Sequence, residues 1–168
     1  MIWIGVDPGT PLTVAALSTD GAAILGIHDE DAVSTREKRA SRKTLVTENS
    51  PELLASVLRP YAALGAQVAV ERVSPMPGQG LASTARFVGS MHMTVGLVAG
   101  LGIPYRLVTP VTWKRAMDLS SDKERSRAMA ARMWPRQADL FRLKKHHDRA
   151  EAALLALWLL RNETRAPA

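Results

Sequence analysis

Cysteine is absent from the 168 residues of the chain. Its absence excludes disulfide bonds, zinc sites built on thiolates and a cysteine nucleophile. Long hydrophobic runs are also missing, since the longest covers only 152–160 and a membrane-spanning helix needs roughly 20 residues. Residues 1–7 have no basic region and already reach an acid at Asp7, which argues against a signal peptide. We therefore expect a cytoplasmic protein without a membrane partner.

Acidic residues are fewer than basic residues in the sequence. The chain has 22 Lys and Arg against 16 Asp and Glu, a formal net charge of +6 and a pI of about 10.2. This balance favours a polyanionic partner, of which nucleic acid is the commonest and an anionic membrane surface the rival. The hydrophobic fraction of 46% is ordinary for a chain with a core, and the length predicts a single domain over 1–168.

Apolar runs bounded by turn residues predict five strands, over 2–7, 12–17, 22–27, 67–71 and 104–108. The Asp20-Gly21 pair is a hairpin signal between the second and third strands. Helices are expected after Ser50, over 81–99, after the capping-box pattern 121–124, and over about 148–160. The polar segment 29–49 is predicted to be a loop. This order predicts an α/β fold in which helices flank a mixed sheet.

Two acids end predicted strands. Asp7 closes the first strand and Glu71 closes the fourth, each after a run that is predicted to be buried. A buried carboxylate is unfavourable unless a partner stabilises it, and a metal ion is one such partner. The alternatives stay open, because Asp7 can cap the turn that follows it and Glu71 can pair with Arg72 at a sheet edge.

A second pair of acids opens the last predicted helix. Asp148 and Glu151 lie three residues apart, so both carboxylates are on one helix face. A helix N-terminus favours negative charge, so ordinary first-turn acids also explain this pair. Taken together, however, the four acids come from three separated segments and contain no His or Cys, which suits a hard cation such as Mg²⁺ or Mn²⁺. Two such ions can activate water and stabilise the leaving oxygen of a phosphodiester.

Three motifs resemble those of RuvC-type Holliday-junction resolvases. The segment 4–10, IGVDPGT, is similar to their opening motif, and Val70-Glu71-Arg72 after a strand is similar to their second acidic motif. The segment 148–156, DRAEAALLA, is similar to their C-terminal motif, where two acids three residues apart open a helix. Many cellular members have Asp in place of Glu151, so the chain looks more like phage-type members.

The resemblance implies an RNase H-like fold, with a five-stranded mixed sheet flanked by helices, and a homodimer that nicks the strands of four-way DNA junctions. It makes Asp7, Glu71, Asp148 and Glu151 the catalytic and metal-binding residues, with two Mg²⁺ ions in each site and Mn²⁺ as a substitute. Lys114, in a Thr-Trp-Lys sequence expected before a helix, matches the active-site lysine of the family. The resemblance implies no small-molecule cofactor, and it places the protein in a bacterial or phage-infected cell.

Basic residues lead into the last acidic pair, and we predict that they contact DNA phosphates. The alternative is a solvated surface loop. The predicted DNA-binding residues are Arg86, Lys144, Lys145, His146 and Arg149. A second basic cluster over 36–43 is predicted to contact the DNA backbone or to be a solvated loop.

The helix expected over 81–99 is the predicted dimer interface, with a central core helix as the alternative. Small residues would permit close approach, namely Ala82, Ala85, Gly89, Gly96 and Ala99. Larger residues would fill the gaps, namely Phe87, Met91 and Met93. Three tryptophans are interpreted as core or interface residues, namely Trp113, Trp134 and Trp158.

Other functional classes are considered beside the resolvases. Actin-like ATPases and sugar kinases also open with an Asp-x-Gly-Thr hairpin, but they need a second lobe with a second phosphate loop, and the sequence has no such motif. A non-catalytic junction-binding protein would not need the intact set of acids. A related nuclease that cuts other branched DNA or RNA–DNA hybrids stays open.

Overall fold

The structure is a computed structural model that describes residues 1–38, 45–75, 78 and 80–164, with the backbone alone at 36–38 and 45–46. Its main sheet has the strand order β3-β2-β1-β6-β7. The strands are β1 (Ile2–Asp7), β2 (Thr13–Leu17), β3 (Ile24–His28), β6 (Ala66–Glu71) and β7 (Tyr105–Val108). β1 to β3 pair antiparallel, while β6 pairs parallel with both β1 and β7. The predicted five-stranded mixed sheet is therefore confirmed.

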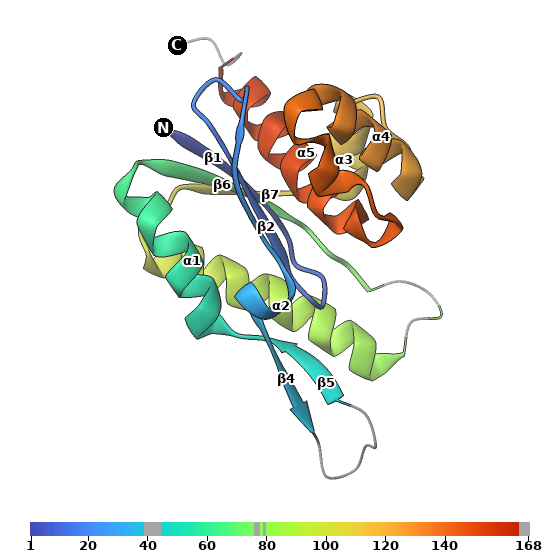
Figure 1. Cartoon of the computed structure of the whole chain (residues 1–168). Helices are drawn as coiled ribbons and strands as arrows, with labels where there is room; N and C mark the ends of the chain where they lie inside the picture. Colours follow the sequence, from blue (N-terminus) through green and yellow to red (C-terminus); the bar gives the residue numbers. More distant parts are fainter. Residues whose placement is uncertain (39–44, 76–77, 79, 165–168) are drawn as a thin grey trace.

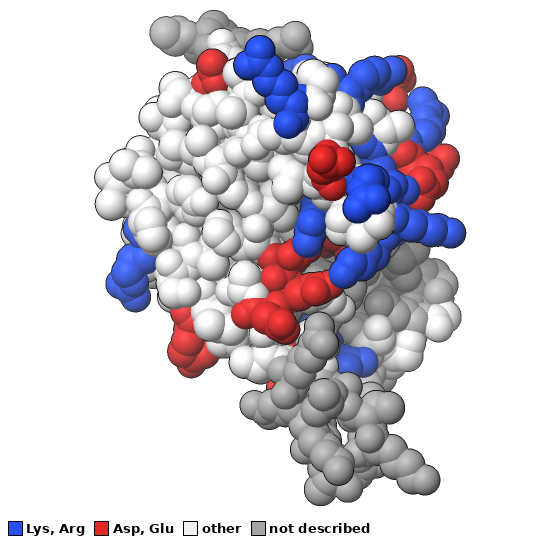
Figure 2. All heavy atoms as spheres, in the orientation of Figure 1, with Lys and Arg blue, Asp and Glu red and all other residues white. Residues whose placement is uncertain are grey.

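Helices cover both faces of this sheet (Figure 1). One face carries α1 (Pro51–Ala63) and α2 (Leu81–Gly100), and the other carries α3 (Pro110–Ala116), α4 (Lys123–Met133) and α5 (His147–Glu163). In Figure 2, which has the same orientation, Lys and Arg side chains gather mainly over the layer of α3, α4 and α5. Among the described residues, no helix is long and apolar enough to cross a membrane.

The two-residue period of β1 divides its side chains between two apolar cores. Ile2, Ile4 and Val6 join the core that includes Leu54 and Leu58 of α1, whereas Trp3 joins the core built around α5. Successive side chains of a strand point to opposite faces, so Gly5 and Asp7 share the α5 face with Trp3. On β6 the same alternation places Ala69 in the α5 core and therefore turns Glu71 to that face.

Gly5 is the point at which α5 meets β1. A Cβ atom at this position would lie 2.0 Å from the Ala152 carbonyl oxygen and 2.7 Å from the Ala156 amide nitrogen. The helix segment 150–159 is buried, with alanine at 150, 152, 153 and 156. Small residues on both elements thus allow the helix backbone to rest directly on the central strand.

The prediction of a loop over 29–49 is wrong. The segment contains a 3₁₀ turn, η1 (Glu30–Ala32), and a hairpin of β4 (Ser34–Lys38) and β5 (Leu45–Asn49). The Asn49 side chain fixes the base of this hairpin, because its Oδ1 accepts from the Leu12 amide and the Ser34 hydroxyl. Its Nδ2 donates to the Gly9 carbonyl and to Ser90 on α2. Part of the predicted basic cluster, residues 39–43, lies outside the described residues.

Two local predictions near α3 and α4 also need correction. Thr112, Trp113 and Lys114 lie inside α3 rather than before a helix, because Thr109 caps the helix by accepting from the Thr112 amide and Pro110 starts it. The cap of α4 is Asp122, which accepts from the Glu124 amide, and not the first residue of the 121–124 pattern. The Ser50 cap of α1 is confirmed.

Gly5→Ala should lower the free energy of unfolding by about 1–3 kcal/mol or more, the range typical of an overpacked core. The reason is that the added Cβ would meet backbone atoms of α5, which cannot rotate away. Gly100→Ala at the end of α2 is the matched control, since a Cβ there lies in open space. Denaturant unfolding followed by circular dichroism measures both variants, and equal midpoints would contradict the proposed contact.

Candidate metal centre

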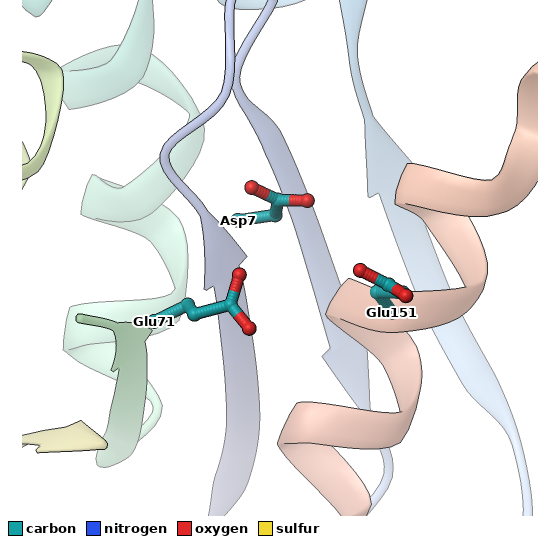
Figure 3. Close-up of side chains that lie close together, drawn as sticks. All are labelled: Asp7, Glu71 and Glu151. Carbon is teal, nitrogen blue, oxygen red and sulfur yellow. The ribbon is translucent and has the colours of Figure 1, made fainter. Parts of the chain in front are cut away.

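Asp7, Glu71 and Glu151 form a buried cluster of carboxylates (Figure 3). One oxygen of each residue lies within 4.8 Å of an oxygen of each of the others. The three residues come from the end of β1, the end of β6 and the second turn of α5, and their side chains converge. Each is less than a tenth exposed, so the cluster is shielded from most of the solvent.

Strand register explains why Asp7 and Glu71 meet. Val6 pairs with Val70 across the parallel β1–β6 ladder, so the next residue of each strand lies at the same sheet edge. The turn-capping alternative for Asp7 also holds, because its Oδ1 accepts from the Gly9 amide at 3.1 Å. This bond orients the carboxylate through one oxygen and leaves the second oxygen for another partner.

Burial raises the pKa of Asp7 well above its usual range, and repulsion from Glu71, Asp148 and Glu151 raises it further. Burial is also the main cause of the raised pKa of Glu71, although a hydrogen bond from Trp113 opposes it. A bound cation would offset this repulsion. Because the three clustered residues supply only carboxylate oxygens, the site fits a hard divalent cation.

Asp148 lies beside the cluster and not within it. Its Oδ1 is 2.9 Å from His147 Nε2 and 3.7 Å from Lys123 Nζ, and its side chain is 36% exposed. Repulsion from its charge nevertheless contributes to the raised pKa values of Asp7 and Glu71. The four-acid metal site therefore stays a prediction, with three members brought together.

Two neighbouring residues of α3 each contact a different acid. The fully buried Trp113 donates from Nε1 to Glu71 Oε1 at 2.8 Å. Lys114 Nζ lies 2.7 Å from Glu151 Oε1, and the same oxygen accepts from Ser126 on α4 at 3.2 Å. Lys114 thus lies beside the acid cluster, and its catalytic role stays a prediction. Sequence reasoning predicted Trp113 only as a core or interface residue and did not select Ser126.

The predicted DNA-binding residues differ in their accessibility. Lys144 and Lys145 are exposed, and Lys145 pairs with Glu30 at 3.1 Å. His146 is buried, its Nδ1 accepts from the Leu143 amide, and burial lowers its pKa. Arg149 makes two hydrogen bonds to Asp29, at 2.6 and 3.2 Å. Arg86 is exposed on α2.

Asp7→Asn should stabilise the metal-free protein at neutral pH. Because the folded state raises the pKa of Asp7, the native chain holds this proton more tightly than the unfolded chain, and stability falls as pH rises through the raised pKa. The Asn side chain cannot ionise, so the variant does not lose stability as the pH rises. A gain of about 1 kcal/mol would raise the Tm by about 2–4 °C in a chain of this size.

Calorimetry in a chelator should show this gain at neutral pH and its disappearance below the ordinary pKa of Asp, where both forms are uncharged. Added Mg²⁺ should then stabilise the wild type and not the variant. A wild-type protein that is the more stable one in chelator at neutral pH would contradict the repulsion.

Trp113→Phe should weaken divalent-cation binding by about tenfold or more, because the lost N–H no longer orients Glu71. Trp134→Phe is the matched control, since that indole is equally buried and donates to the Gly21 carbonyl, away from the acids. Mn²⁺ titration by electron paramagnetic resonance measures the affinity of each. Equal Mn²⁺ affinities in the two variants would show that Trp113 packs in the core without orienting Glu71.

Comparison with known proteins places this site in a known fold. No protein family model matches the chain. Over 104 residues, 61% of the chain, it is 33% identical to the chloroplastic Holliday junction resolvase MOC1 of Chlamydomonas reinhardtii, and the match spans 12% of that protein. All of the chain aligns with 99% of T. thermophilus RuvC in complex with a Holliday junction substrate, at a TM-score of 0.59 and 17% identity. A second Thermus thermophilus RuvC structure aligns over 100% of both chains, at a TM-score of 0.55 and 17% identity. The fold predicted from the motifs is thus confirmed, and the chain has the RNase H-like fold of RuvC.

Proposed function

We propose that the protein is a metal-dependent endonuclease that resolves four-way DNA junctions by paired nicks. The observation that carries the proposal is the convergence of Asp7, Glu71 and Glu151 in a RuvC-like fold. The names of the similar proteins support it, since one is a Holliday junction resolvase and one was solved with a Holliday junction. We propose that it acts in the cytoplasm of a bacterial or phage-infected cell, because a chain without cysteine suits a reducing compartment and Glu151 resembles phage-type members.

Asp7, Glu71 and Glu151 would hold the cation, and Asp148 would join them if its carboxylate turned from His147 and Lys123. We propose Mg²⁺, with Mn²⁺ as a substitute and two ions in each site, because the clustered acids offer only oxygen donors. Bound ions of this kind activate water and stabilise the leaving oxygen of a phosphodiester.

The chain's own residues prepare the site for a phosphate. Trp113 fixes Glu71, while Lys114 and Ser126 fix Glu151, so two of the acids are oriented before the substrate arrives. Lys114 also brings a positive charge to the edge of the cluster, where it stabilises the charge that develops on the phosphate. The products would carry a 5′-phosphate and a 3′-hydroxyl.

DNA would first meet the exposed cations Lys144, Lys145 and Arg86. Arg149 and His146 remain part of the proposed surface, but each has a protein partner that DNA would have to replace, as Lys145 has in Glu30. For Arg149 that partner is Asp29, and for His146 it is the Leu143 amide. We therefore expect these two residues to shape the loop before α5 as well as to approach the DNA.

Glu71→Gln should abolish junction cleavage while leaving junction binding intact, because the amide weakens the cation site and the basic surface is unchanged. The cleavage rate should fall by more than about 10–100-fold, which is the change typical of replacing a residue that only hydrogen-bonds to a metal ligand. Glu52→Gln on the exposed start of α1 is the control. Four-way junction, duplex, flap and RNA–DNA hybrid are compared with Mg²⁺ and with a chelator.

A rate that is unchanged in Glu71→Gln would place the active site elsewhere. Preference for the flap or the hybrid would favour the related nucleases. Tight junction binding without cleavage by the wild type would favour a non-catalytic junction-binding protein.

We also propose a symmetric dimer, because two nicks in opposing strands need two acid clusters and the described residues of one chain supply one. The buried side of α2 consists of Ser90, Met91, Thr94 and Val98. Its predicted small interface residues lie on the exposed face, namely Ala82, Ala85, Gly89, Gly96 and Ala99. Met91 is corrected from an interface residue to a core residue, since it is only 6% exposed and accepts from the Val73 amide.

Gly89→Glu should convert the dimer into a monomer and paired nicks into single nicks, since a charged side chain would separate the two helices. Ser56→Glu, on the exposed side of α1, is the control. Light scattering with and without junction DNA gives the assembly. A wild-type monomer that makes paired nicks would refute this arrangement.

A further inference from the structure

A cavity of about 280 Å³ lies against α3 and the chain that follows it. Pro110, Val111 and Leu119 form its apolar wall. Val111 is 75% exposed, so a large part of this wall contacts water. Burial of exposed apolar surface is favourable, which makes the wall a place for a flat, weakly polar group.

The rest of the cavity lining is polar or cationic. Ser120 and Ser121 supply hydroxyl groups, and Lys114 and Arg115 supply positive charge. The lining contains no carboxylate. By contrast, three other described cavities include Glu48, Glu52 or Glu124 in their linings. The α3 cavity therefore favours a ligand that combines an apolar ring with negative charge, as a nucleotide does.

Lys114 connects the cavity to the acid cluster. It lines the cavity, and its Nζ lies 2.7 Å from Glu151 Oε1. A group in the cavity is thus separated from the carboxylates by little more than one lysine side chain. Successive nucleotides of one strand are about 3.4 Å apart along the axis of a duplex, so a neighbour of the scissile phosphate falls within reach.

We propose that the α3 cavity binds a nucleobase of the cleaved strand, within about two nucleotides of the scissile phosphate. The base lies against Val111 and Leu119, its edge faces Ser120 and Ser121, and its phosphate pairs with Arg115. This inference rests on the proposed function, because it assumes that a DNA strand crosses the acid cluster. It assigns to the chain a subsite that senses the base next to the cut.

The test uses junctions in which a single abasic nucleotide replaces each position around the mapped cut in turn. Anisotropy in Ca²⁺ measures binding without requiring cleavage. For the wild type, we expect one abasic position to weaken binding by about tenfold, which corresponds to the loss of one buried base. Val111→Ser should weaken binding to the intact junction and should remove most of that abasic penalty.

Leu64→Ser is the matched control, because Leu64 is an exposed leucine at the end of α1, on the other face of the sheet. It should leave the abasic profile unchanged. An equal abasic penalty in the wild type and Val111→Ser, or no penalty at any position, would overturn the subsite. If Val111→Ser removes the abasic penalty but the wild type does not cleave the junction, the subsite is supported and the proposed nuclease activity is refuted. Failure to bind DNA would refute both.

Discussion

The close approach of α5 to β1 is the contact on which the site depends. Gly5 has no side chain, so the backbone of α5 rests on the central strand at Ala152 and Ala156. Glu151 precedes Ala152 and is thereby carried to the sheet edge where Asp7 ends β1. A wider spacing between helix and strand would separate the carboxylates and admit water between them. The same contact therefore sets both the distance between the acids and their low exposure.

Much of this arrangement could be predicted from local patterns. Strands β1 and β6 are short apolar runs that end in acids, and a two-residue period assigns their last residues to one face. The start of α5 is marked by acids three residues apart. These signals are strong because each depends on a few adjacent residues, and they were sufficient for the fold and for the convergence of Asp7, Glu71 and Glu151.

The features that were not predicted depend on contacts between distant segments. The β4–β5 hairpin has no apolar period, and Asn49 anchors it through hydrogen bonds to the turn after β1 and to α2. Burial of Trp113 was foreseen, but the direction of its N–H depends on where α3 packs. Asp148 was expected to face the metal with Glu151, yet spacing alone could not reveal the competing partners His147 and Lys123.

The α3 helix links the chemistry of the two glutamates. Trp113 gives Glu71 a neutral hydrogen bond, whereas Lys114 gives Glu151 a charged one. A neutral donor orients Glu71 without cancelling its charge, so this acid keeps its attraction for a cation. Lys114 lies in an ion pair with Glu151, and in the proposed function its charge would be available to a phosphate beside the acids. One short helix thus contacts both glutamates, and in the proposed function it would orient Glu71 toward the cation.

The acid cluster has few basic residues beside it in the part of the chain that the structure describes. Three carboxylates converge with Lys114 as their nearby basic partner, and burial and mutual repulsion raise the pKa of Asp7. A second lysine would relieve this repulsion and would make the native state more stable, but it would also compete with a metal ion for the same oxygens. Functional sites commonly keep unfavourable interactions of this kind. In the proposed function, the mutual repulsion of these acids would favour binding of a cation, and the two apolar cores supply the stability that offsets the repulsion.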